Sequence, residues 1–297
     1  MTAARPILAA TDFSERAGMA LERAAQCARQ IGAPLVLLHV VERYHLDALQ
    51  RLAQEAGALG GADWPARARA ELERHASRIA QTHGVAVDTE VRIGRVFEEI
   101  AESAAARAAE LTVIGAHGEH FLRDLLLGAT AQKAVRRNPG STLVVRRGGS
   151  APYGHVLVPV DFSPDAAAAL AAARRLAPEA RLHVLHAYEL PFEGKLFYAG
   201  VAQTVVDEYC ELAEREAERE LAAFLAGAGA AELASARVVH GHAPDVVVKE
   251  AARRDADLVA IGAHGRSELS YFMLGSVSLH VVLEAQCDVL VAKRPGP

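Results

Sequence analysis

The sequence contains little cysteine and no excess of basic residues, and each of these shortages excludes a class of protein. Its three cysteines, Cys27, Cys210 and Cys287, lie far apart and form no CxxC pair, so they provide neither a zinc site nor a disulfide framework. We expect all three to be small buried apolar residues. With 32 basic against 37 acidic residues, the formal net charge is −5. No strongly basic surface can therefore offset a phosphate backbone, and we expect no nucleic-acid partner.

Long apolar runs are also missing. No uninterrupted stretch of the chain approaches the ~18–20 apolar residues that a membrane-spanning helix needs. Residues 1–6 lead into a strand-like segment without the apolar core of a signal peptide. We therefore expect a cytoplasmic protein without a membrane partner. The residues that are present, 51% hydrophobic and 23% charged, are typical of a globular fold.

The chain contains two copies of one unit. Asp12-Phe13-Ser14 recurs 149 residues later, and from His39 onward the repeat holds at 147 residues, since His39 returns as His186. Such a sustained repeat indicates a duplicated domain. Between the copies lies a Gly/Ser/Pro-rich stretch at 146–152, which is typical of a linker. We predict domains at 1–147 and 153–297, joined by a linker at 148–152.

Each half alternates short apolar runs with helical patterns. Continuous apolar runs predict strands that are covered on both faces, and therefore parallel sheets with helices above and below. Five strands and four helices per half predict two doubly wound α/β domains. Ser14 and Ser163 are candidate helix N-caps, and Pro164 suits a first helical position. The predicted strands are 7–10, 35–41, 85–92, 111–115 and 142–146, then 156–160, 181–187, 236–240, 258–262 and 289–293.

Ligands of open parallel sheets bind beyond the carboxyl ends of the strands. Asp12 and Asp161 follow the first strand of each half, and a glycine pattern follows the fourth. The pattern is Gly, two residues, Gly, nine residues, Gly, and it occurs at 115–128 and again at 262–275. Glycine permits positive φ and close approach of backbone N–H groups to a phosphate, and the helix that begins at the last glycine adds its positive dipole end. The pattern is neither a Walker A motif nor a GxGxxG fingerprint.

These features together resemble the universal stress protein family in its ATP-binding branch, twice in tandem over nearly the whole chain. The resemblance implies a strand order of 3-2-1-4-5 in each α/β domain, similar to that of adenine-nucleotide alpha hydrolases, and an ATP site per domain. Adenine and ribose would lie near the aspartate after the first strand and the end of the second strand. The phosphates would lie on the glycine segment and on a hydroxyl at the helix start.

The resemblance carries over position by position. In the first half the implied residues are Thr11, Asp12, Val40, Ile114, Gly115, His117, Gly118, Gly128, Ala129 and Thr130. In the second half they are Pro159, Val160, Asp161, Ala187, Ile261, Gly262, His264, Gly265, Gly275, Ser276 and Val277.

The two halves differ at the hydroxyl position. Ser276 in the second half is matched by Ala129 in the first, where Thr130 stands one residue later, and Pro159 is matched by Ala10. A hydrogen bond to a charged group contributes about 1.5–3 kcal/mol. We therefore predict that the second site binds nucleotide more strongly.

Three functions stay open at this point. The first is an ATP-binding regulatory protein of the stress response, with Mg²⁺ accompanying the ATP, no evident catalytic base, and at most slow ATP hydrolysis. The second is an ATP-dependent transferase, although no acid/base pair other than Asp12 and Asp161 repeats. The third is an interaction module without a ligand, in which the glycines only shape turns.

Histidines and partners complete the expectations. His39 and His186 end strand-two runs, where a hydrogen-bonded structural histidine is the usual case, and we expect no metal site made by protein groups alone. Members of the family commonly pair through their last strand. The resemblance therefore implies that the two halves can pair within one chain as a pseudo-dimer, and it leaves a further homodimer open.

Overall fold

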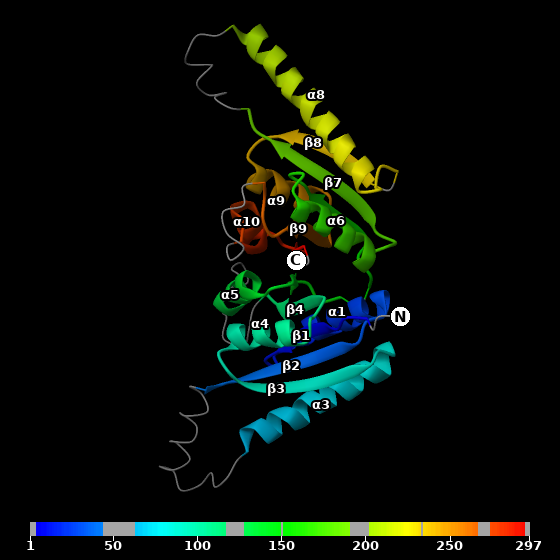
Figure 1. The fold of residues 1–297 in the computed structure, drawn as a ribbon, viewed down its shortest axis with the longest axis vertical. Coiled ribbons are helices and arrows are strands. Elements are labelled where there is room, and N and C mark those ends of the chain that lie inside the picture. Colours follow the sequence, from blue (N-terminus) through cyan, green and yellow to red (C-terminus); the bar gives the residue numbers. More distant parts are fainter. Residues whose placement is uncertain are drawn as a thin grey trace. The chain divides into compact units, whose positions relative to one another are not determined.

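The computed structural model describes residues 4–43, 63–116, 128–149, 151–190, 202–232, 234–266 and 274–294. The chain divides into two compact units, one reaching from the start of the chain to Pro152 and the other spanning Tyr153–Arg294. Each unit has its own parallel strands and its own covering helices (Figure 1).

The first unit alternates strands and helices along the chain. Its five strands are all parallel and lie in the order β3-β2-β1-β4-β5, which confirms the predicted order. The elements are β1 (Ile7–Thr11), α1 (Glu15–Ile31), β2 (Leu35–Glu42), α3 (Trp64–His83), β3 (Val87–Gly94), α4 (Val96–Ala106), β4 (Leu111–Gly115), α5 (Ala129–Arg137) and β5 (Ser141–Val145).

The second unit repeats this architecture. Its parallel strands lie in the order β8-β7-β6-β9-β10, so the doubly wound α/β fold is confirmed in both halves. The elements are β6 (His155–Pro159), α6 (Pro164–Leu176), β7 (Arg181–Tyr188), α8 (Gln203–Gly227), β8 (Ala234–His240), α9 (Ala243–Arg253), β9 (Leu258–Gly262), α10 (Ser276–Glu284) and β10 (Asp288–Ala292).

The central strands are buried on both faces, as their continuous apolar runs predict. Ile7, Leu8 and Ala9 of β1 have no exposed surface, and β9 and β10 are buried along their whole length. Helix α1 contacts α3, and α4 contacts α5. Right-handed crossovers place these two pairs on opposite faces of the sheet. Because the strands of a unit are parallel, their carboxyl ends lie together, and the connections to the following helices begin there.

The predicted caps are confirmed, and one cysteine corrects its prediction. The Ser14 hydroxyl accepts a hydrogen bond from the backbone N–H of Ala17, and the Ser163 hydroxyl accepts one from that of Ala166. Cys27 and Cys287 are buried, but Cys210 is only half-buried. Cys210 lies in the first half of α8, whose buried residues begin at Ala217. Across the described ranges no helix is long and apolar enough to span a membrane.

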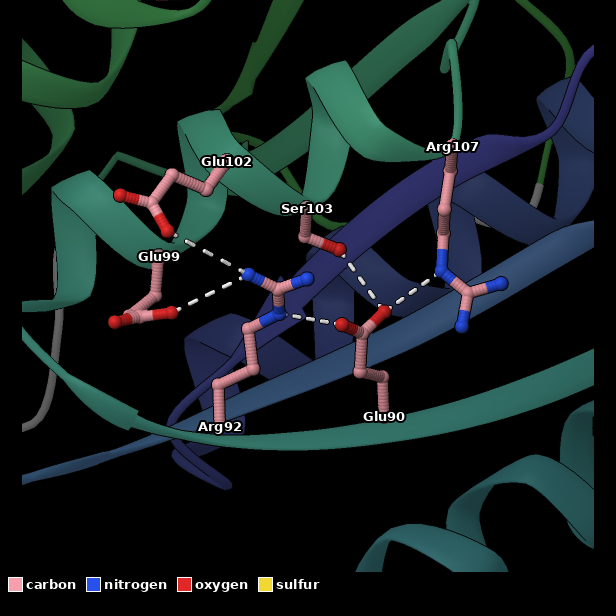
Figure 2. A network of polar contacts seen from close by, with 6 residues as sticks. All are labelled: Glu90, Arg92, Glu99, Glu102, Ser103 and Arg107. Carbon is pink, nitrogen blue, oxygen red and sulfur yellow. Dashed lines mark hydrogen bonds and ion pairs between the residues drawn. The ribbon is translucent and has the colours of Figure 1, made fainter.

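A group of charged residues ties β3 to α4 in the first unit (Figure 2). The Glu90 carboxylate accepts hydrogen bonds from Arg92, from the Ser103 hydroxyl at 3.0 Å and from Arg107 at 2.7 Å. Burial alone would raise the pKa of Glu90, but these hydrogen bonds outweigh it and hold the pKa below its ordinary value. The carboxylate is therefore bound more favourably in its charged form, which joins the strand to the helix.

In the second unit, ion pairs also connect the third strand, β8, to the following helix, α9, but the positions of the charges are exchanged. By the 147-residue repeat, Arg237 replaces Glu90 and Glu250 replaces Ser103. The Glu250 carboxylate lies 3.8 Å from Arg237 of β8 and accepts a hydrogen bond from Arg254 at 3.2 Å. Hydrogen bonds from Arg253 also lower the pKa of Glu250 and outweigh the opposing effect of burial. The acidic partner has moved from the strand to the helix.

Replacing Glu90 by Gln should lower the free energy of unfolding by about 1–2 kcal/mol at pH 7, after allowance for solvent screening. The loss arises because the ion pairs to the two arginines disappear. Since the folded pKa of Glu90 is lowered, its stabilisation is complete above the ordinary carboxyl value and fades as pH falls through the folded pKa. Urea unfolding followed by circular dichroism at pH 7 and in acid checks both effects.

Glu102→Gln is the matched control. Its side chain is 70% exposed and lies 3.9 Å from Arg92, so we expect a change within about 0.5 kcal/mol. Equal effects of the two substitutions would contradict the conclusion that Glu90 connects β3 to α4.

Candidate functional site

The Asp-Phe-Ser sequence forms the same tight turn after the first strand of each unit. Oδ1 of Asp12 accepts a hydrogen bond from the N–H of Ser14 at 3.0 Å, and Oδ1 of Asp161 accepts one from Ser163 at 3.1 Å. The intervening Phe13 has φ of 66°, a left-handed conformation that costs a non-glycine residue about 1–2 kcal/mol. The hydrogen bonds offset this cost, so the motif is first of all a turn that begins a helix.

The turn places the phenylalanine ring on a histidine of the second strand. The rings of Phe13 and His39 stack with centroids 4.2 Å apart, and those of Phe162 and His186 lie 4.3 Å apart. Nδ1 of His39 lies 2.8 Å from the Thr11 carbonyl oxygen, and Nδ1 of His186 lies 2.8 Å from the carbonyl oxygen of Val160, the residue after β6. Burial lowers the pKa of His39 despite this bond and the nearby aspartate. Both histidines are thus hydrogen-bonded structural residues, as predicted.

A cleft of about 520 Å³ opens at the carboxyl ends of β1, β2 and β4 in the first unit. This volume lies within the range of small-molecule sites. Apolar residues of α4 and α5, including Val96, Ile100 and Ala134, line it together with the polar side chains of Asp12 and Glu42. The cleft therefore combines an apolar part with carboxylates near the strand ends.

The cleft brings together every predicted first-half residue that the structure describes. These residues are Thr11, Asp12, Val40, Ile114, Gly115, Gly128, Ala129 and Thr130. His117 and Gly118 lie outside the described residues.

The predicted second-half residues occupy the matching elements. Strand β6 ends at Pro159 and is followed by Val160 and Asp161, and β7 contains Ala187. Strand β9 ends with Ile261 and Gly262, and His264 and Gly265 come after it. The start of α10 comprises Gly275, Ser276 and Val277.

The last glycine of each pattern begins a helix in the same way. The N–H of Gly128 donates to the Ala116 carbonyl oxygen at 2.9 Å, and that of Gly275 donates to Ala263 at 2.8 Å. Each glycine is the N-cap of its helix, and neither helix has a side-chain cap. The first N–H groups of α5 and α10 are thus left without a capping side chain, which is the arrangement that accepts an anion.

Glycines of the second pattern serve close packing, and none of the described glycines in either pattern has positive φ. Positive φ occurs among the described glycines at Gly32, Gly84, Gly229 and Gly241. A Cβ at Gly262 would instead lie 2.8 Å from the backbone nitrogen of Ala166, and one at Gly265 would lie 2.7 Å from Oδ2 of Asp161. At Gly262 the backbone at the start of α6 is too close for any side chain, whereas a Cβ at Gly265 would displace the Asp161 carboxylate.

Three polar residues that the sequence did not single out support the second site. Oγ of Ser278 donates to the Gly262 carbonyl oxygen at 2.6 Å. Asp165 is buried and contacts His264 through backbone and side chain. Arg266 lies 4.9 Å over the Phe162 ring. The sequence held one sign that Asp165 is special: the two halves differ at this position, where the first half has Arg16.

Burial also affects Lys293 beside Asp165. Desolvation lowers the pKa of the Lys293 ammonium group, and the charge of Asp165 opposes this shift.

Within the described part of the chain, no three His, Cys, Asp or Glu residues gather as metal ligands.

Comparison with known proteins places this fold in one family. A model described as the Universal stress protein family matches residues 3–146 and, a second time, residues 152–293. A universal stress protein of Mycolicibacterium smegmatis is 28% identical over 97% of this chain and 96% of its own length. One from Methanocaldococcus jannaschii is 24% identical and aligns 97% of its length with 49% of this chain.

Solved structures show the same fold over the whole chain. A crystal structure of a functionally unknown protein from Pseudomonas aeruginosa PAO1 has a TM-score of 0.62 and 23% identity, covering 98% of this chain and 93% of its own. A universal stress protein from Archaeoglobus fulgidus has a TM-score of 0.65 and 17% identity, covering 98% and 99%.

Replacing Gly262 by Ala should destabilise the second unit by about 1–3 kcal/mol, because the added methyl group would overlap the backbone at the start of α6. Thermal unfolding followed by circular dichroism measures the change. Gly227→Ala is the control, since a Cβ there meets nothing within 4 Å and should stabilise α8 by about 0.5 kcal/mol. A neutral Gly262→Ala would refute the close-packing explanation.

Proposed function

Because the chain belongs to the universal stress protein family, with two tandem copies of its domain, we propose that it is an ATP-binding protein with a regulatory role in the stress response. The observation that carries this proposal is the cleft at the ends of β1, β2 and β4, which meets the uncapped start of α5. A ligand with an apolar ring at one end and an anionic group at the other matches these two features.

Adenosine triphosphate fits the chemistry of the cleft. The apolar side chains of Val40, Val96 and Ile100 offer a surface for adenine, and the Asp12 carboxylate can accept hydrogen bonds from ribose hydroxyls. The phosphates would lie on the N–H groups that begin α5, where the helix dipole favours negative charge. In the second unit the equivalent groups are Asp161 and the start of α10.

Mg²⁺ would enter with the nucleotide. This ion is usually held by phosphate oxygens with one or two carboxylates, and Asp12 and Glu42 line the first cleft. The ion would neutralise phosphate charge beside these carboxylates.

A regulatory role is favoured over a dedicated enzymatic one. The histidines nearest the turn, His39 and His186, have Nδ1 bonded to the carbonyl oxygens of Thr11 and Val160, so each supports the turn. The repeated Asp12 and Asp161 carboxylates likewise hold their turns. Nucleotide occupancy, and at most slow hydrolysis, would then alter the surface that the domain offers to partners.

Adding ATP with Mg²⁺ to the purified chain should raise its unfolding temperature. A ligand at about 100 times its dissociation constant stabilises the folded state by about 2.7 kcal/mol. Thermal unfolding with ATP, with GTP and without nucleotide checks the effect, and mass spectrometry of released ligands identifies any nucleotide that copurifies. No shift and no released nucleotide would support a ligand-free interaction module; stoichiometric ATP consumption with a second substrate would support a transferase.

We further propose that the second site binds more tightly, because Ser276 offers a hydroxyl donor at the position that Ala129 occupies in the first. Ser276 is exposed at the start of α10, so it can reach a ligand there. Ser276→Ala should weaken the tighter binding event about tenfold. Ala129→Ser should strengthen the weaker event, and isothermal titration of the full chain with ATP measures both.

The two substitutions control for each other because they exchange the same side chain at equivalent positions. Tight binding that survives Ser276→Ala unchanged would contradict the proposed order of the two sites.

A further inference from the structure

Asp165 makes three hydrogen bonds to chain segments that are distant in sequence. Its Oδ2 accepts a bond from the backbone N–H of His264 at 3.1 Å and lies 2.9 Å from Nδ1 of the same residue. Its Oδ1 accepts a bond from the N–H of Arg294 at 3.3 Å. The side chain is only 8% exposed. A buried carboxylate with both oxygens bonded is a strong and directional attachment.

Asp165 is one of three side chains at alternate positions that hold the same short stretch. The Ser163 hydroxyl donates to the His264 carbonyl oxygen at 3.3 Å, and Oδ2 of Asp161 accepts from the Arg266 N–H at 3.2 Å. Together they hold residues 264–266, the stretch that surrounds Gly265. The turn after β6 therefore holds the backbone that follows β9.

We propose that Asp165 is a positioning residue for phosphate binding in the second domain: it holds residues 264–266 in the shape that binds phosphates without touching the ligand itself. This inference rests on the proposed nucleotide-binding function. The reason is physical, because a segment that is ordered before binding loses less conformational freedom when the ligand arrives. Near-complete burial and satisfied oxygens exclude Asp165 as a direct ligand in this arrangement.

The first domain carries a different residue at this position. The repeat places Arg16 there, while its glycine pattern contains His117 at the position of His264. At this position of the repeat, a carboxylate is therefore available in the second domain and not in the first. It adds a second reason, besides Ser276, for unequal binding by the two sites.

Asp165→Asn tests the inference in the full chain. The amide removes the charge and replaces one acceptor oxygen by a donor, so the bonds to His264 and Arg294 cannot all form. We expect the tight ATP-binding event to weaken about tenfold. Adenosine binding should stay unchanged, because adenosine has no phosphates for this stretch to bind. Isothermal titration with ATP and with adenosine measures both affinities.

Asp245→Asn is the matched control. Asp245 also lies in the first turn of a helix and contacts a histidine, with Oδ2 at 3.2 Å from Nδ1 of His242. Its side chain is 55% exposed, its nearer partner His242 is three residues away, and Nε2 of His280 in α10 lies 4.0 Å from its Oδ1. The same charge change there should alter neither affinity.

His264→Ala provides a milder second variant. It removes the side-chain contact but keeps the backbone N–H that bonds to Asp165, so a smaller loss of ATP affinity is expected. Circular dichroism shows whether each variant is folded, and if Asp165→Asn unfolds, the ATP-to-adenosine ratio of His264→Ala decides the question.

The outcomes separate the inference from the function on which it rests. A wild-type chain that binds no ATP overturns the proposed function. A wild-type chain that binds ATP, with unchanged affinity in Asp165→Asn, overturns the positioning role alone. Equal weakening of ATP and adenosine also overturns it, because a purely structural residue would affect both ligands alike.

Discussion

Parallel strands that are buried on both faces constrain everything else in this protein. Such strands cannot be joined by tight turns, so within each unit the chain returns through helices that cover the sheet, and the carboxyl ends of that unit's strands lie together. The turns after β1 and β6, the ends of β2 and β7, and the ends of β4 and β9 are thereby gathered in each unit. The first cleft lies at these ends because only there do the connections diverge.

The Asp-Phe-Ser turn shows how one short motif serves both folding and a ligand site. Asp161 holds the turn through one carboxylate oxygen and the backbone of Arg266 through the other. A group that would bind ribose is thus also one that supports the glycine segment. Binding at this aspartate would be coupled to the shape of that segment, which is a physical basis for a nucleotide-dependent change in surface.

Duplication has kept the scaffold while the contacts have diverged. Strand three is joined to the next helix by Glu90 in one unit and by Glu250, on the helix, in the other. In both units an ion pair connects this strand to the helix, and either arrangement of charge makes the connection. Near the glycine segment the differences have another consequence, since Asp165 and Ser276 replace Arg16 and Ala129. The two sites therefore differ in residues that would act on phosphate.

The sequence by itself determined the fold class, the strand order implied by family resemblance, the helix caps at Ser14 and Ser163, and eight of the residues that line the first cleft. These follow from local patterns and from a repeat, which can be recognised without knowing any distance. Only the tertiary structure decided why the glycines are needed, that Cys210 is half-buried, and that Asp165 holds residues 264–266. The glycine contacts and the bonds of Asp165 to His264 and Arg294 join atoms from segments about 100 to 130 residues apart. Such contacts leave no periodic pattern in the chain, because one side chain meeting a distant backbone group is a single event of packing.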